Sequence, residues 1–228
     1  MELRIKDLVK LLAVPEKSIR QWVKENRIPH HVISHQVRFN RAEINEWILE
    51  ARPEMASKLL KLSIAGRPTR LTDLLRLGGI HYDLPGRTVQ EILKNALENF
   101  RAPEGLSKAD LLATLIDREA MMTTAVGRGI AIPHPRTPII TKVEDSRVAV
   151  FLLKKPANFG ALDGRPVHTL FLLLAENPRR HLEVLSKISY LCQLPEFLDL
   201  LESRRPEDEI FGFVQARERE WRRTSKGV

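Results

Sequence analysis

Two continuous apolar runs constrain the fold of this chain more than any other feature. They read VAVFLL at 148–153 and TLFLLLA at 169–175, and each has the length of one β-strand. Amphipathic segments of helical periodicity lie before and after them, at 88–100, 107–119 and 178–193. Apolar strands need helices packed over them. The pattern therefore predicts a mixed α/β sandwich in which helices flank a small mixed sheet.

The chain divides into two domains joined by a basic connector. Segment 53–70 has no acidic residue after Glu54 and is interrupted by prolines and a glycine. Its basic residues are Lys58, Lys61, Arg67 and Arg70. We expect a first domain at 1–52, a linker at 53–70 that could include a short helix, a second domain at 71–216 and a basic tail at 217–228.

Composition narrows the class of protein. The net charge of +8 is a weak indication of contact with a polyanion. The single cysteine, Cys192, excludes an internal disulfide framework and fits a reducing cytoplasm. No apolar run approaches the ~20 residues that span a bilayer, and charged residues interrupt the N-terminal segment where a signal peptide would be apolar. We expect a cytoplasmic protein without a membrane span.

The first fifty residues have the pattern of a winged helix-turn-helix. Apolar residues at helical spacing predict a helix at 5–13, and Pro15 suits the start of a second helix. Alternation over 28–40 predicts a hairpin, and Asn40 can cap a third helix at 41–51. Helix, turn, helix, hairpin and helix together predict a small winged helix-turn-helix head on an α+β chain.

The open face of the second predicted helix carries side chains suited to nucleic acid. Arg20, Gln21 and Lys24 are of the types that read base edges or hold phosphates. Residues near the start of this helix can meet a phosphate, and the hairpin would contact the DNA backbone. A merely solvated helix face is the alternative. The candidate DNA-binding residues are Lys17, Ser18, Arg20, Gln21, Lys24 and Arg38.

Residues 3–50 resemble the DNA-binding head of the MerR and excisionase families. The resemblance lies in LVKLLAVPEKSIRQWVKENRIPHHV and in VRFNRAEINEWI. It implies that the second helix lies in the major groove and that the hairpin touches an adjacent backbone or the minor groove; some domains of this shape bind proteins instead. The histidines at 30, 31 and 35 lack the paired ligands of a zinc finger, so we predict no metal site.

One histidine of the second domain stands between two prolines, in TTAVGRGIAIPHPR at 123–136. Pro135 restricts His134 to an extended backbone, and Pro133 has its own φ fixed. The Arg118 side chain, the hydroxyls of two threonines and the amides of the glycine turn could hold a phosphoryl group near the ring. From the residues alone, a polar surface histidine is the alternative. The threonines are Thr123 and Thr124.

The segment DREAMMTTAVGRGIAIPHPR is similar to the active site of type-2 EIIA components of the phosphoenolpyruvate-dependent phosphotransferase system. This is the group of mannitol/fructose and nitrogen-regulatory proteins, and the likeness extends over about 71–215. It implies that His134 accepts a phosphoryl group from a phosphorylated HPr-type carrier, that Arg118 and His181 assist it, and that no cofactor is needed.

This sequence departs from the family pattern in two places. Pro135 stands where relatives have glycine, which removes an N–H from the site. The residues at 122–125 are Met-Thr-Thr-Ala, where relatives have Gly-Ser-Thr-Gly. Both changes could slow phosphoryl transfer or leave a site that binds without turnover. His81 and His168 match no family position, and we predict structural roles for both.

Together the two resemblances predict a DNA-binding transcriptional regulator. Phosphorylation of its EIIA-like domain on His134 would couple the state of the phosphotransferase system to DNA or partner binding. One alternative is a phosphocarrier enzyme component with the head as a docking module. Another is a DNA-binding protein with a degenerate, unphosphorylated EIIA domain. The expected partners are double-stranded DNA and a phosphorylated HPr-type carrier, and the sequence leaves homodimer formation open.

Overall fold

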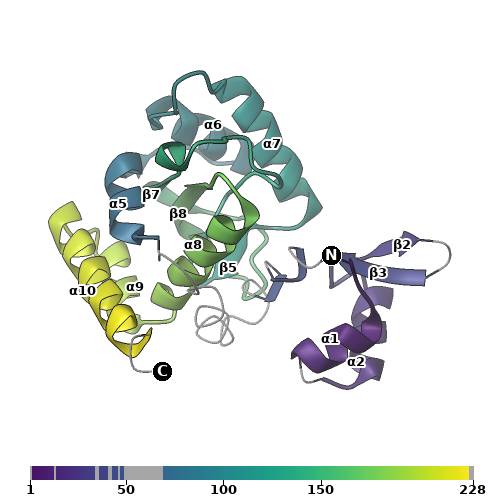
Figure 1. Cartoon of the computed structure of the whole chain (residues 1–228). Coiled ribbons are helices and arrows are strands. Elements are labelled where there is room, and N and C mark those ends of the chain that lie inside the picture. Colours follow the sequence, from purple (N-terminus) through teal and green to yellow (C-terminus); the bar gives the residue numbers. More distant parts are fainter. Residues whose placement is uncertain are drawn as a thin grey trace.

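The computed structural model describes residues 2–12, 14–33, 36–40, 43–45, 47–48 and 69–225 of the chain (Figure 1). The residues up to 48 form a small N-terminal head, and those from 69 onward form a larger domain. The linker predicted at 53–70, with its optional short helix, lies outside the described residues except for its last two positions.

The head has the predicted order of helices and strands. Helices α1 (Ile5–Leu12) and α2 (Glu16–Lys24) are followed by the antiparallel strands β2 (His31–Ile33) and β3 (Gln36–Asn40). Strand β1 (Glu2–Leu3) adds a third strand beside β3, which the sequence did not predict. Residues 43–45 and 47–48 are helical. The buried apolar residues of the head that the structure describes are Leu3, Leu8, Leu12, Ile19, Ile28, Phe39, Ile44, Trp47 and Ile48.

The larger domain is built on a five-stranded mixed sheet with the strand order β4-β7-β8-β6-β5. The predicted apolar runs form the two central antiparallel strands, β7 (Arg147–Ala157) and β8 (Val167–Leu174). Strand β4 (Ile80–Leu84) pairs parallel with β7, and β6 (Ile130–Ala131) pairs parallel with β8. Strand β5 (Ala125–Gly127) closes the other edge, antiparallel to β6.

Helices cover both faces of this sheet, as the apolar strands require. Alternate residues of β7 belong to different cores, because Val148 and Val150 face one core while Ala149 and Phe151 face the other. The second core is covered by α6 (Val89–Asn99) and α7 (Lys108–Met121), which lie together in Figure 1. The first core is covered by α5 (Leu71–Gly78), α8 (Pro178–Leu191), α9 (Pro195–Glu202) and α10 (Glu207–Ser225).

Local capping signals mark where three of these helices begin. Thr88 and Glu91 form a complete capping box at α6. Ser107 accepts a hydrogen bond from the amide of Asp110 at α7, and Asn177 caps α8 just before its first-turn proline. These caps fix the register of the helices that carry Arg118 and His181.

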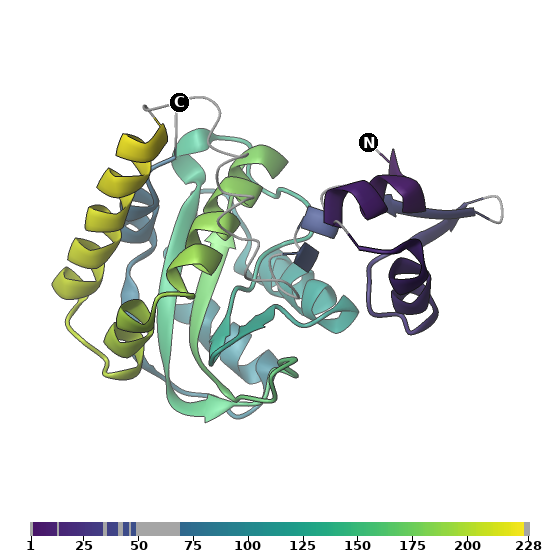
Figure 2. The same ribbon diagram turned by 90° about the horizontal axis from the view of Figure 1, so that it is seen from below.

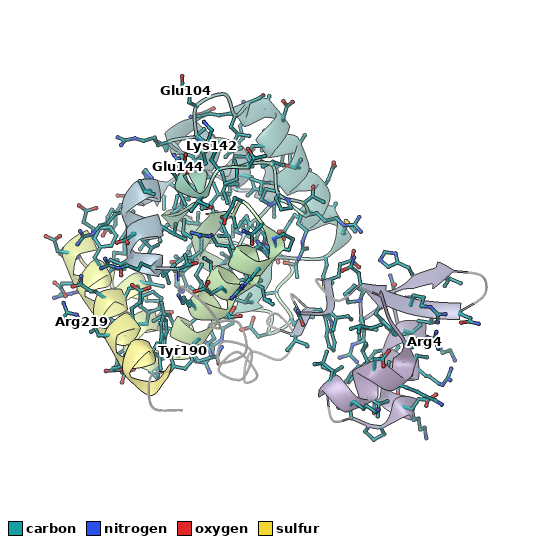
Figure 3. All side chains as sticks on the ribbon, in the orientation of Figure 1. Arg4, Glu104, Lys142, Glu144, Tyr190 and Arg219 are labelled. Carbon is teal, nitrogen blue, oxygen red and sulfur yellow. The ribbon has the colours of Figure 1, made fainter. Side chains whose placement is uncertain are left out.

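The C-terminal segment differs from the predicted tail at 217–228. Helix α10 continues to Ser225, so residues 217–225 belong to a helix of the larger domain. The ring of Trp221 lies 5.5 Å from that of Tyr190 in α8, and Figure 3 shows Tyr190 beside α10. Packing of this half-buried aromatic pair stabilises the last turns of α10 against α8.

Buried charged side chains hold the first described residues of the larger domain. The carboxylate of Glu183 in α8 accepts hydrogen bonds from the amide and the hydroxyl of Thr69. Glu218 in α10 accepts from the amides of Leu71 and Thr72 at the start of α5. Their carboxylates satisfy amide groups at the helix start that no intrahelical carbonyl can reach. These hydrogen bonds therefore hold the first residues of the larger domain, Thr69 to Thr72, against α8 and α10.

Candidate phosphoryl-acceptor site

A strained turn leads into the strand before His134. Gly127, Arg128 and Gly129 all have positive φ, at 86°, 55° and 77°. A Cβ at Gly129 would lie 2.2 Å from the His168 ring, so only glycine fits there. The turn joins β5 to β6 and explains why a GRG sequence precedes the apolar IAI.

His134 lies at the end of this strand, beside the sheet. The amide of Leu173 in β8 donates to the carbonyl of Pro133 at 3.0 Å, which continues the pairing of β6 with β8 past the strand end. The side chain of His134 is only 1% exposed. Its Nδ1 lies 2.7 Å from the carbonyl oxygen of Ile132. Since a carbonyl can only accept, Nδ1 carries the hydrogen, and the neutral ring has its lone pair on Nε2.

The ring of His181 lies against that of His134. The two centroids are 4.7 Å apart, and the planes are inclined at 58°. His181 belongs to the first turn of α8, whose cap Asn177 accepts from the amide of Arg180 at 2.9 Å. The N-terminus of a helix carries partial positive charge, which favours an anion. The fold thus brings together the two histidines that the family resemblance pairs.

Arg118 lies near the end of α7 and is 6% exposed. Its Nη1 donates to the carbonyl of Met122 at 2.8 Å, in the turn that leads to β5. The same turn connects to the His134 strand, because the amide of Ile132 donates to the carbonyl of Thr124 at 2.9 Å. Arg118 and His134 are therefore anchored to the same pair of neighbouring strands.

The hydroxyls of Thr123 and Thr124 are engaged within the domain. Thr123 donates to the carbonyl of Phe159 at 2.5 Å, and Thr124 donates to a carboxylate oxygen of Glu119 at 2.5 Å. A hydroxyl has a single hydrogen to donate. The phosphate-stabilising role predicted for these threonines would require each to exchange its acceptor for a phosphoryl oxygen. Burial raises the pKa of the Glu119 carboxyl, although Thr124 hydrogen bonds oppose this.

The two histidines with predicted structural roles make ordinary packing contacts. His81 stacks on Phe151 with centroids 4.7 Å apart. His168 has Nδ1 2.8 Å from the hydroxyl of Thr169, and burial lowers the pKa of its ring. In the described part of the chain, no three histidine, cysteine, aspartate or glutamate side chains are grouped as metal ligands.

The candidate DNA-binding residues lie on α2 and β3 of the head. Lys17, Arg20, Gln21 and Lys24 are exposed on α2, and Ser18 in its first turn is half-buried. Arg20 is paired with Glu16 at 2.6 Å, so binding a phosphate would require Arg20 to leave an exposed ion pair of small strength. Arg38 is half-buried on β3 and donates to Gln36 at 2.5 Å.

Comparison with known proteins identifies the larger domain. Residues 73–216 match the family model described as "Phosphoenolpyruvate-dependent sugar phosphotransferase system, EIIA 2", a span of more than half the chain. The chain belongs to this EIIA family. Residues 2–52 match the model described as "Helix-turn-helix domain". The head is thus a helix-turn-helix domain, and the MerR or excisionase likeness is a plausible reading of it.

Relatives of the EIIA domain include nitrogen regulatory proteins. Those of Bradyrhizobium diazoefficiens and Pseudomonas aeruginosa are 30% and 32% identical, and the match covers 94% of each relative and 63% and 64% of this chain. The crystal structure of IIA-Ntr from Neisseria meningitidis is 28% identical with a TM-score of 0.57. It covers 64% of this chain and 99% of that protein. None of the helices in the described ranges is both long and apolar enough to cross a membrane.

Three residues around this site were given no role by the sequence reasoning. Glu119 accepts hydrogen bonds from the amide and hydroxyl of Thr124, and thereby shapes the turn before β5. Arg136 and Glu43 form an ion pair of 2.6 Å between the EIIA domain and the head. The sequence signal for Glu119 is its position beside Arg118. Nothing in the sequence relates residues 43 and 136, because 93 positions separate them.

Proposed function

We propose that this protein is a DNA-binding regulator whose EIIA domain takes up a phosphoryl group on His134 from a phosphorylated HPr-type carrier. The observation that carries this proposal is the hydrogen bond from Nδ1 of His134 to the Ile132 carbonyl, at 2.7 Å. It holds the uncharged ring in the tautomer whose Nε2 is nucleophilic. The nearby ring of His181 and the start of α8 supply favourable dipoles for the incoming anion.

The transfer is an in-line displacement at phosphorus. The Nε2 lone pair of His134 forms the new phosphorus–nitrogen bond, and the electron pair of the broken bond stays with the carrier. The protein contributes to this step mainly by positioning the reacting groups and by neutralising the charge of the phosphoryl group. Arg118 is the natural clamp for phosphoryl oxygens, with His181 as a hydrogen-bond donor. Thr123 and Thr124 would contribute only after exchanging their present acceptors.

Incubation with a phosphorylated HPr-type carrier tests this step directly. We expect acid-labile, base-stable phosphate on Nε2 of His134, detected by phosphopeptide mapping and by ³¹P NMR. His134→Ala should abolish the label, whereas His81→Ala, which lies outside the site, should keep it. Absence of label on His134 in the unchanged protein would contradict the proposal and favour a degenerate EIIA domain that only binds partners.

Salt-titrated DNA binding tests the role of the head. Four cationic side chains are proposed to contact phosphates: Lys17, Arg20, Lys24 and Arg38. Each phosphate contact contributes about −0.9 to the slope of log affinity against log salt, so we expect a slope of about −3 to −4 on a duplex pool. Arg20→Gln should reduce it by about one, while Lys10→Gln on α1 should not. A flat salt response would instead favour a phosphocarrier component whose head is a docking module.

The state of phosphorylation is proposed to change DNA or partner binding. Phosphohistidine adds close to two negative charges to a strongly basic protein. Affinity for the duplex pool, measured with and without phosphorylated carrier, should therefore differ in the unchanged protein and be equal in His134→Ala. A homodimer on two half-sites is the arrangement we expect on DNA. Sedimentation of the complex measures that stoichiometry.

A further inference from the structure

The head and the EIIA domain meet at the segment that carries His134. Arg136, two positions after His134, donates from Nη2 to Oε1 of Glu43 in the head at 2.6 Å. The other carboxylate oxygen, Oε2, lies 2.9 Å from Nε2 of His31 in β2. Figures 1 and 2 both show the helical residues 43–45 and 47–48 between the head sheet and the EIIA domain. One carboxylate thus connects the loop after His134 to the wing.

Two cavities extend this contact on either side of Arg136, which lines both. The first, of about 400 Å³, is lined by residues of both domains that include Pro135, His181, Asn40 and Asn45. The second, of about 470 Å³, is lined by residues that include Arg118, Met122, Trp22 and Trp47. His181 lines the first cavity and Arg118 the second, so both residues that the family resemblance places beside His134 border a space shared with the head.

The approach of a carrier protein to His134 conflicts with this position of the head. In-line transfer requires the donor phosphorus within about 3–3.5 Å of Nε2. A carrier must therefore cover the surface around Pro135, Arg136 and His181, where residues of the head also line a cavity. Apolar side chains at the edge of the second cavity are exposed, with Met121 at 59% and Leu162 at 78%. Exposed apolar side chains that border a contact are typical of a surface that another protein covers.

The DNA-reading side of the head is not part of this contact. Among the six candidate DNA-binding residues, none lines either cavity. The exposed side chains of Lys17, Gln21 and Lys24 on α2 belong to this group. The docked head therefore lies at the EIIA surface next to His134, where Pro135 and Arg136 line the cavities, and leaves the exposed side chains of α2 accessible.

We propose that the EIIA face around His134 is a docking surface with two mutually exclusive occupants. One is the helix-turn-helix head of the same chain, and the other is the phosphorylated carrier. The inference rests on the proposed function, since it requires His134 to accept a phosphoryl group. The new dianion forms two residues from Arg136, where it attracts this guanidinium and repels the Glu43 carboxylate. Phosphorylation thereby keeps the head undocked.

Weakening the Glu43–Arg136 pair in the full-length protein tests the competition. Glu43→Gln should raise the initial rate of phosphorylation by the carrier about two- to fivefold, which matches the modest strength of a partly exposed ion pair. Glu43→Arg places two cations together and should raise the rate further. The matched control is Glu16→Gln, which removes a head carboxylate far along the chain from the contact. Rates that are equal in all four proteins would overturn the inference.

A second measurement follows docking without any phosphoryl transfer. Dyes attached to cysteines at exposed Lys10 and Leu77 report the distance between the domains by energy transfer. Cys192 need not be replaced, because burial raises the pKa of its thiol to about 12. Glu43→Arg should lower the transfer efficiency, and Glu43→Arg combined with Arg136→Glu should restore it.

The two measurements separate the possible failures. If neither the unchanged protein nor any Glu43 variant is phosphorylated on His134, the proposed function is wrong. The proposed competition between head and carrier is then wrong as well, even if the Glu43 substitutions change the energy transfer. If phosphorylation proceeds but neither its rate nor the energy transfer changes with Glu43, only the docking inference is overturned. Faster labelling together with lower energy transfer in Glu43→Arg supports it.

Discussion

Replacing Lys187 with methionine tests the buried charges that tie the start of the EIIA domain to α8. Nζ of Lys187 lies 2.8 Å from Oε1 of Glu183 and also donates to the carbonyl of Thr69. The two charged side chains are only 3% and 7% exposed. Methionine keeps most of the side-chain volume but leaves Glu183 buried without its counter-charge. Removing one partner of a buried pair costs about 3–5 kcal/mol, and we expect this loss in the free energy of unfolding.

Urea denaturation followed by circular dichroism measures the loss, provided that the m-value is unchanged. In thermal denaturation, the same loss of free energy of unfolding corresponds to a melting temperature about 6–20 °C lower for a domain of this size. The double variant Lys187→Met with Glu183→Gln has neither buried charge. It should recover much of the lost free energy of unfolding, because burying a neutral group costs less hydration than burying a charged one. Exposed Arg179→Met on the same helix is the control. A loss below about 1 kcal/mol in Lys187→Met, or a double variant as unstable as the sum of the singles, would refute the reasoning.

Three further predictions follow from glycine, carboxyl and thiol environments. Gly78→Ala should destabilise the protein by at least about 1–3 kcal/mol in urea, because its Cβ would lie 2.2 Å from the carbonyl of Val148. Gly212→Ala, whose Cβ would meet nothing within 4 Å, should instead stabilise α10 by about 0.5–1 kcal/mol. Equal changes in the free energy of unfolding for Gly78→Ala and Gly212→Ala would contradict the close contact at Gly78. Burial raises the pKa of Glu119, so its contribution to stability is complete below the ordinary value of 4.5 and is lost as pH rises through the folded pKa. The free energy of unfolding of the unchanged protein, relative to that of Glu119→Gln, should therefore fall as the pH rises above 4.5, and a difference that does not change with pH would disprove this. Iodoacetamide should not alkylate Cys192 until the protein unfolds, since burial raises the pKa of this thiol to about 12; rapid labelling of the folded protein would show an open thiol.

The local pattern of apolar and polar residues was sufficient to predict most of the helices and strands. The runs at 148–153 and 169–175 form β7 and β8, and the amphipathic segments before and after them form α6, α7 and α8. Strand β4 was not predicted, because its middle residues are polar and it pairs with the distant strand β7 rather than with a neighbouring segment. Helix α5 escaped as well, since it is eight residues long and its start is capped by Glu218 rather than by a neighbouring side chain.

The sequence by itself determined the chemistry that the site can offer. Prolines on both sides restrict the backbone of His134, and the proline after Asn177 predicts a helix start just before His181. The family resemblance supplied the expectation that these two histidines meet. Their separation of 4.7 Å, however, results from α8 packing on the sheet beside the extension of β6.

Only the tertiary structure decided what surrounds that site. In the folded protein, His134 is buried, and the hydroxyls of Thr123 and Thr124 donate to acceptors inside the domain. Glu43 and Arg136, 93 positions apart in the sequence, form a hydrogen bond. Periodicity encodes which face of a segment is apolar, and capping residues encode where it begins. Neither encodes which distant segments come together, because that depends on how whole helices and strands pack against one another.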